Sequence, residues 1–172
     1  MQKVLYLAGG CFWGLQHYFD QVAGVLSTEV GYANANMENP SYEQVCTGQT
    51  DAAETVEVVY DDDVIGLEDV LNLFFYAVDP TQLNRQGNDR GTQYRSGIYA
   101  GSQADLARVQ QYVDALKEQS EAKIVTEVKP LESFAPAESY HQKYLKKNPF
   151  GYCHIGREEF EYARNYKVAA AG

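Results

Sequence analysis

The chain has few of the residues that mark metal sites and disulfide scaffolds. Its 172 residues include three cysteines, three histidines and one tryptophan. The cysteines are Cys11, Cys46 and Cys153, an odd number with no C-x-x-C pair, which argues against a zinc site and against a small disulfide-linked scaffold. No metal or other cofactor is therefore expected. Isolated thiols of this kind are typical of catalysis, redox sensing or core packing.

Positive charge is also scarce. Lysine and arginine number 14 against 24 aspartates and glutamates, so the formal net charge is −10 at pH 7. Nucleic acids and acidic membrane surfaces recruit Lys and Arg, so neither is an expected partner. No apolar run approaches membrane-spanning length, and the first residues lack the pattern of a secretory signal. The cytoplasm is the expected compartment.

The hydrophobic pattern predicts alternating strands and helices within one domain, residues 1–172, expected to be a monomer. Strands are expected at Lys3–Leu7, Val25–Gly31, Glu54–Tyr60, Ser96–Ala100 and Ile124–Lys129. Helices are expected directly after Cys11, over Leu67–Val78, after Ser102 and, more briefly, over Pro136–Leu145. The last four residues, Ala169–Gly172, are expected to fray.

The order of these elements predicts the fold class. The second and third strands follow one another without a helix between them, which does not suit a doubly wound parallel sheet. The order favours an α+β two-layer sandwich with helices on a mixed sheet, a ferredoxin-like plait. Long irregular loops are expected over 34–50 and 79–95, together with a coil-rich C-terminal segment that is mobile from about residue 147.

Cys11 is the first candidate for a reactive residue. It stands where the first strand turns into a helix, directly after Gly9 and Gly10. The unpaired N–H groups and the dipole of a helix N-terminus favour a thiolate, so Cys11 is expected to be more acidic than a free cysteine. The alternative is a buried cysteine that only packs, because free cysteine is among the most buried residue types. Cys46 is expected to pack in this way.

Glu54 is the second candidate. In a strand, side chains at even separations share a face, so Glu54 faces the same way as Val56 and Val58. If that is the core face, burial raises the pKa of the carboxyl and lets it hold a proton near neutral pH. The alternative is that Glu54 begins the strand in solvent. The loop over 79–95 also has two interpretations. Its polar groups could bind a ligand, or the loop could simply be solvated.

Five motifs, in this order along the chain, resemble the A-type peptide-methionine sulfoxide reductases. They are Gly10–Gly14 (GCFWG), Asn39–Tyr42 (NPSY), Gln86–Asp89 (QGND), Gly91–Ser96 (GTQYRS) and Lys147–Cys153 (KNPFGYC). The resemblance extends from about Val4 to His154. It implies reduction of the S epimer of methionine sulfoxide, free or in a protein, as repair of oxidative damage.

The resemblance also implies roles for particular residues. Cys11 attacks the sulfoxide sulfur as a thiolate and becomes a sulfenic acid. Glu54 supplies the proton, helped by hydrogen bonds from Tyr42 and Tyr94. Cys153 then forms a disulfide with Cys11, which a dithiol partner, thioredoxin, reduces. The rings of Phe12 and Trp13 hold the S-methyl group, and Asp89 binds the polar part of the substrate.

The chain departs from the family pattern at three places, namely Asp51-Ala52, Val78 and Asn34-Ala35. Asp51 is expected to add a like charge near Glu54 and so to raise its pKa further. Two alternative functions stay open on the residues alone. A thiol peroxidase would use the same thiols without a methyl pocket, and a binding protein for oxidised methionine would need no chemistry.

Overall fold

The computed structural model of the chain describes residues 1–168, and the predicted fraying of Ala169–Gly172 lies outside them. A six-stranded sheet has the order β7-β6-β1-β3-β2-β8, in which β6 and β7 are parallel and every other neighbouring pair is antiparallel. Its strands are β1 (Gln2–Ala8), β2 (Val25–Ala33), β3 (Ala53–Asp61), β6 (Gly97–Ala100), β7 (Glu127–Pro130) and β8 (Phe134–Pro136). A small separate hairpin pairs β4 (Arg85–Gln86) with β5 (Asp89–Arg90).

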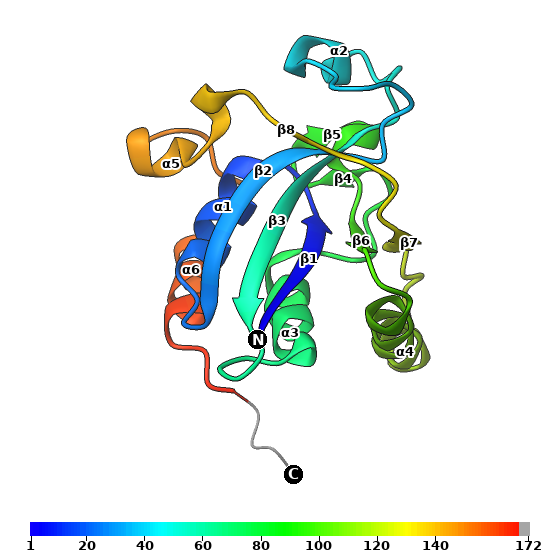
Figure 1. Cartoon of the computed structure of the whole chain (residues 1–172), viewed down its shortest axis with the longest axis vertical. Coiled ribbons are helices and arrows are strands. Elements are labelled where there is room, and N and C mark those ends of the chain that lie inside the picture. The colour runs from blue at the N-terminus through cyan, green and yellow to red at the C-terminus, as the bar shows by residue number, and fades with distance from the viewer. Residues whose placement is uncertain (169–172) are drawn as a thin grey trace.

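Three longer helices cover one face of this sheet (Figure 1). They are α1 (Phe12–Asp20), α3 (Leu67–Ala77) and α4 (Gln103–Gln119). The order β1-α1-β2-β3-α3-β6, with the central strands arranged β6-β1-β3-β2, is that of a ferredoxin-like plait. Strands β7 and β8 extend its two edges. The predicted fold class is therefore confirmed.

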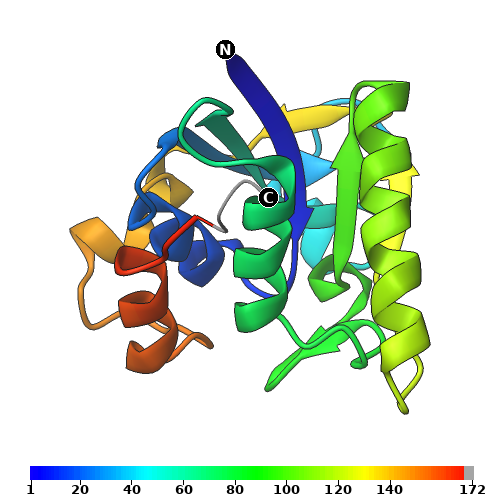
Figure 2. The same cartoon turned by 90° about the horizontal axis from the view of Figure 1, so that it is seen from below.

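The core lies between the helices and the sheet, as the alternation along β1 dictates. Leu5 and Leu7 are fully buried against the helices, whereas Ala8 and the β6 residue Tyr99 pack on the opposite face with Phe134. Figure 2 shows α3 between α4 on one side and α1 with the short C-terminal helix α6 (Arg157–Arg164) on the other.

The helix predicted over 136–145 is wrong. Residues up to Pro136 belong to strand β8, and the Ala137 N–H donates to the Val30 carbonyl of β2 at 2.9 Å. A 3₁₀ turn over Ser139–His141 follows, and helix α5 covers only Tyr144–Lys147. Lys143 between them has φ +54, a left-handed conformation that interrupts any continuous helix.

Two short helices were not predicted, because neither carries a long apolar stripe. Helix α2 (Tyr42–Cys46) lies in the segment expected to be irregular, and its N-cap Ser41 forms a capping box with Gln44. Helix α6 buries only Ala163 fully. Within residues 1–168, no helix is long and apolar enough to cross a membrane.

Candidate active site

Cys11 is the N-cap residue of α1, at the end of the turn that leaves β1. Gly10 before it has φ +75, which a side chain would strain, and Cys11 itself is 8% exposed. A Cβ added to Gly9 would lie 2.6 Å from a methyl of Val78, so this position also needs a glycine. The turn therefore holds the thiol at the C-terminal end of the central strand β1 with little solvent around it.

Glu54 lies on β3 and approaches the same turn from the sheet. It is 1% exposed, and the Phe12 N–H donates to its Oε1 at 3.2 Å. Among the described residues its Oε2 has no hydrogen-bond partner. Burial above all raises the pKa of Glu54 to about 8; the Phe12 amide opposes this, and the charge of Asp89 adds to it. The parity prediction that Glu54 faces the core is confirmed, and Glu54 does not begin the strand in solvent.

The expectation of an acidic Cys11 thiol is wrong for the free protein. Burial and the neighbouring Glu54 charge raise its pKa well above the usual value, and the Trp13 N–H only partly opposes them. The helix N-terminus is present, but its first amide, that of Phe12, donates to Glu54. Proton positions on Cys11 and Glu54 are therefore linked, because loss of the carboxyl proton disfavours the thiolate.

Two phenols complete the polar part of the site. Tyr42 begins α2, and Tyr94 ends the 3₁₀ turn that starts at Thr92. Burial is the main cause that raises the pKa of both, and the charge of Glu54 contributes at each. Both are thus neutral O–H donors near the carboxyl. In the described part of the chain, neither donates to the free oxygen of Glu54.

Aromatic rings form the apolar side of the site. Phe12 is 1% exposed, and its ring centroid lies 5.2 Å from that of His141. Trp13 stacks on Tyr144 at 3.7 Å, and its indole N–H donates to Nδ1 of His141 at 2.9 Å. His141 and Tyr144 were not singled out from the sequence. A signal existed for His141, since the chain has only three histidines.

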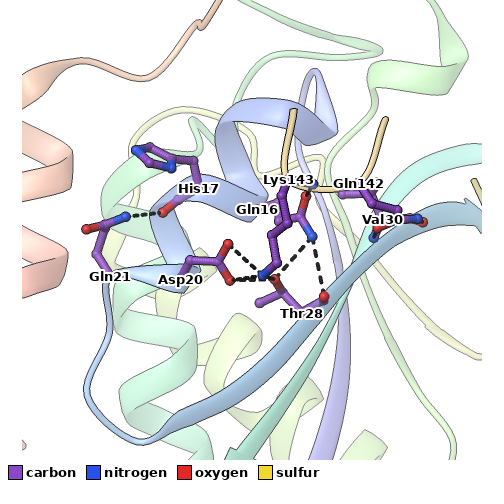
Figure 3. Close-up of polar contacts among 8 residues, drawn as sticks. All are labelled: Gln16, His17, Asp20, Gln21, Thr28, Val30, Gln142 and Lys143. Atoms are coloured by element: carbon purple, nitrogen blue, oxygen red, sulfur yellow. Dashed lines mark hydrogen bonds and ion pairs between the residues drawn. The ribbon is translucent and has the colours of Figure 1, made fainter. Parts of the chain in front are cut away.

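The segment that carries His141 is fixed to α1 and β2 by a polar network (Figure 3). The side-chain amide of Gln142 bonds both ways with the Val30 backbone, accepting at 3.0 Å and donating at 2.8 Å. The Lys143 ammonium lies 2.8 Å from both carboxylate oxygens of Asp20. These contacts hold Lys143 in its left-handed conformation and so determine where His141 meets Trp13.

Cys153 lies one helical turn from Cys11, against Gly14. A Cβ on Gly14 would lie 3.0 Å from the Cys153 sulfur, and residues three apart share a helix face. The Cys153 thiol donates to the Ile155 carbonyl at 3.2 Å, and all three cysteines are free thiols. Burial raises the pKa of Cys153. The fold thus brings two sequence-distant thiols to the same end of α1.

Asp89 and His154 meet beside this turn. His154 Nδ1 lies 3.8 Å from Asp89 Oδ2, with the two side chains 7% and 14% exposed. A Cβ on Gly10 would lie 2.8 Å from His154 Nε2. Asp89 therefore faces the C-terminal segment as well as Cys11, whose pKa its charge helps to raise. His154 was not singled out from the sequence, although it directly follows Cys153.

Two expectations about neighbouring residues are corrected. Cys46 is exposed at the end of α2 and does not pack in the core. Asp51 does not contribute to the raised pKa of Glu54; the acid that does is Asp89. The Asp51 carbonyl instead accepts from Arg95 at 2.9 Å.

Comparison with known proteins matches this arrangement to one family. The sequence profile described as peptide methionine sulfoxide reductase matches residues 3–170. The chain belongs to this family. MsrA of Lachnoclostridium phytofermentans is 51% identical over 165 residues, which cover 96% of this chain and 99% of that protein.

Solved structures of the reductase family agree with the fold. Reduced Mxr1 from Saccharomyces cerevisiae has a TM-score of 0.85 at 40% identity, covering 90% of this chain and 91% of that chain. Mxr1 in complex with Trx2 has a TM-score of 0.60 at 28% identity, covering 83% and 84% of the two chains. The likeness thus extends over most of this chain.

Proposed function

We propose that this chain reduces methionine sulfoxide to methionine with its own thiols. The observation that carries the proposal is the pairing of Cys11 with Glu54, a buried carboxyl whose Oε2 has no partner among the described residues. A sulfoxide oxygen is a poor leaving group until it is protonated. A neutral carboxyl near a soft nucleophile provides both the proton for the sulfoxide oxygen and the attack on the sulfoxide sulfur.

The first step balances without an outside acid. The Cys11 sulfur attacks the sulfoxide sulfur while Glu54 gives its proton to the oxygen, and the thiol proton passes to the resulting carboxylate. The oxygen then passes from the substrate sulfur to the Cys11 sulfur. As this S–O bond forms, the sulfoxide S–O bond and the bond between the two sulfurs break, which releases methionine and leaves Cys11 as a sulfenic acid. The raised pKa of Glu54, about 8, keeps the required proton in place at neutral pH. Tyr42 and Tyr94 are proposed to donate to the oxygen as negative charge builds on it.

The S-methyl group is proposed to lie against Phe12 and Trp13. Sulfur–aromatic contacts contribute roughly 0.3–1.5 kcal/mol each, which orients a methyl sulfide without binding it tightly. The network of Figure 3 serves this step because it holds the segment in which His141 accepts a hydrogen bond from the indole N–H. Asp89 is proposed to bind the polar part of the substrate, and access to it requires the Tyr152–His154 segment to shift.

Regeneration is proposed to run through Cys153 and thioredoxin. Cys153 condenses with the Cys11 sulfenic acid to give a disulfide and water. Thioredoxin is the proposed reductant, and Mxr1, whose fold this chain shares, has been solved in complex with Trx2. Helix α6 is held to α3 by the stacked Tyr76 and Tyr162 rings, 3.6 Å apart, so we propose that the moving part is confined to 148–156. The cytoplasm, where thiols stay reduced, is the proposed compartment.

The test uses the two epimers of a methionine sulfoxide peptide separately, without oxygen and with dithiothreitol as electron source. We expect the S epimer to be consumed and the R epimer to persist. Hydrogen peroxide is offered in parallel, because a peroxidase would prefer it. Reduction of neither epimer by the folded protein would overturn the proposal.

A further inference from the structure

The side chain of His154 is buried without a defined function. Its two ring nitrogens have no hydrogen-bond partner within residues 1–168, although the side chain is only 7% exposed. The Gly9 carbonyl lies near the ring without the geometry of a hydrogen bond. An unpartnered polar ring in this position costs stability, so a use for it in the chemistry is expected.

The His154 ring lies beside the thiol of Cys153. Both approach the same point above Gly14, where an added Cβ would lie 3.0 Å from the Cys153 sulfur and 3.4 Å from His154 Nδ1. Asp89 Oδ2 lies 3.8 Å from the same nitrogen, and it too lacks a hydrogen-bond partner in the described chain. Thiol, imidazole and carboxylate therefore occur together, in the combination that activates nucleophiles elsewhere.

We propose that His154 is the general base for Cys153 in the step that forms the disulfide, with Asp89 stabilising the imidazolium. This inference rests on the proposed function, since the sulfenic acid on Cys11 is its oxidant. The Cys153 thiol gives its proton to His154, and the sulfur attacks Cys11. The S–S bond forms as the S–O bond breaks, and the hydroxide that leaves takes the proton from His154 to become water.

The protonation states suit this role. Burial lowers the pKa of His154, so the ring is a free base at neutral pH, and the charges of Asp89 on β5 and Glu159 on α6 oppose burial, as does the Gly9 carbonyl. Burial also raises the pKa of Cys153, so that thiol needs a base. Its proton now points to the Ile155 carbonyl, 3.2 Å away, and rotation of the thiol would aim it at the ring.

The experiment separates the two chemical steps in one turnover. Reduced enzyme is mixed with one equivalent of methionine S-sulfoxide and quenched with an alkylating agent. Methionine is measured by chromatography and the disulfide by the mass of the alkylated protein. In His154→Ala and His154→Gln, disulfide formation should slow at least about tenfold more than methionine formation. Added imidazole should restore part of the rate in His154→Ala.

Two further measurements exclude a merely structural role. His17→Ala is the matched control. The His17 ring packs on Phe160 of α6 with the ring centroids 4.9 Å apart, so its removal loosens the same region. It should leave the ratio of the two rates unchanged. In the wild type the rate of disulfide formation should not change between about pH 7 and 8, where the His154 ring is a free base. In His154→Ala it should rise about tenfold per pH unit, following the thiol itself.

Equal slowing in His17→Ala, or an unaltered rate ratio and pH profile in His154→Ala, would overturn the assignment of His154. The failure of the proposed function gives a different result, because then no methionine appears in the first turnover of any variant, including the wild type.

Discussion

The backbone N–H of Phe12, the first amide of α1, donates to Glu54 at 3.2 Å and not to the thiol of Cys11. The free amide expected to favour a thiolate is therefore used by the carboxyl. This contact ties the acid to the turn that carries the nucleophile, and it opposes the effect of burial on the Glu54 pKa. The pKa of the Glu54 carboxyl and that of the Cys11 thiol are both raised in this arrangement, which favours the protonated form of each group.

Replacement of Glu54 by Gln should slow methionine formation by at least about 100-fold at pH 7, since general acid catalysis typically contributes about 10²–10⁴-fold. In the wild type the first-turnover rate should fall as pH rises through about 8, where Glu54 loses its proton. The variant should show no such fall, because an amide does not titrate. A wild-type rate that stays constant to pH 9 would contradict the role of the neutral carboxyl.

The same substitution should alter stability in a pH-dependent way. The pKa of Glu54 is raised from 4.5 to about 8 on folding, so the folded chain keeps a proton that the unfolded chain loses. Wild-type stability therefore declines as pH rises from about 4.5 through about 8. Relative to the wild type, Glu54→Gln should gain on the order of a few kcal/mol between these limits, as measured by urea unfolding.

Glu127→Gln is the matched control for this effect. The pKa of Glu127 is lowered, because the favourable contacts with Arg95 and Tyr99 outweigh its burial, and Arg95 Nε lies 3.1 Å from its carboxylate. The stability that this group contributes is present above its unfolded pKa and is lost only as pH falls below it. The difference between Glu127→Gln and the wild type should thus stay constant above about pH 5.

The Cys153→Ser variant should form one methionine per Cys11 and then stop when thioredoxin is the only reductant. The serine hydroxyl cannot condense with the sulfenic acid, although dithiothreitol can still reduce Cys11 directly. Cys46→Ser should cycle normally, since Cys46 is exposed on α2. Normal thioredoxin-driven turnover in Cys153→Ser, assayed by NADPH consumption with thioredoxin reductase, would show that another thiol resolves the intermediate.

Much of this site could be predicted from the sequence, within a clear limit. Strand parity was enough to place Glu54 in the core, because alternation along a strand is a local property. The pKa of Cys11 was not predictable in this way. It depends on Glu54, a residue 43 positions later that takes the Phe12 amide, and only the folded chain brings the two together.

The polar network around His141 could not be read from the sequence for the same reason. A helix was expected over 136–145. Instead, hydrogen bonds to the Val30 backbone and to the Asp20 carboxylate hold Gln142 and Lys143 in a non-helical conformation. Pairing with distant partners outweighs local preference here, and His141 reaches Trp13 only because of it.

His141→Ala should weaken substrate binding more than catalysis. The half-buried indole N–H of Trp13 would lose its acceptor, 2.9 Å away, and an unpaired donor costs up to about 1–3 kcal/mol when it is fully buried. Trp13 would then leave its present rotamer, so KM should rise while the first-turnover rate at saturation changes little. Steady-state kinetics with dithiothreitol checks this, and near-ultraviolet circular dichroism reports the indole. A lower saturating rate with an unchanged KM would contradict it.

Gly14→Ala tests whether the position of Cys153 against α1 matters for turnover. Within a helix the substitution favours folding by up to about 1 kcal/mol. The new methyl group, however, would lie 3.0 Å from the Cys153 sulfur and 3.4 Å from His154, which must move away. Methionine formation with dithiothreitol should persist while disulfide formation slows, because Cys153 no longer rests one turn from Cys11. Disulfide formation at the wild-type rate would mean that this resting contact has no part in recycling.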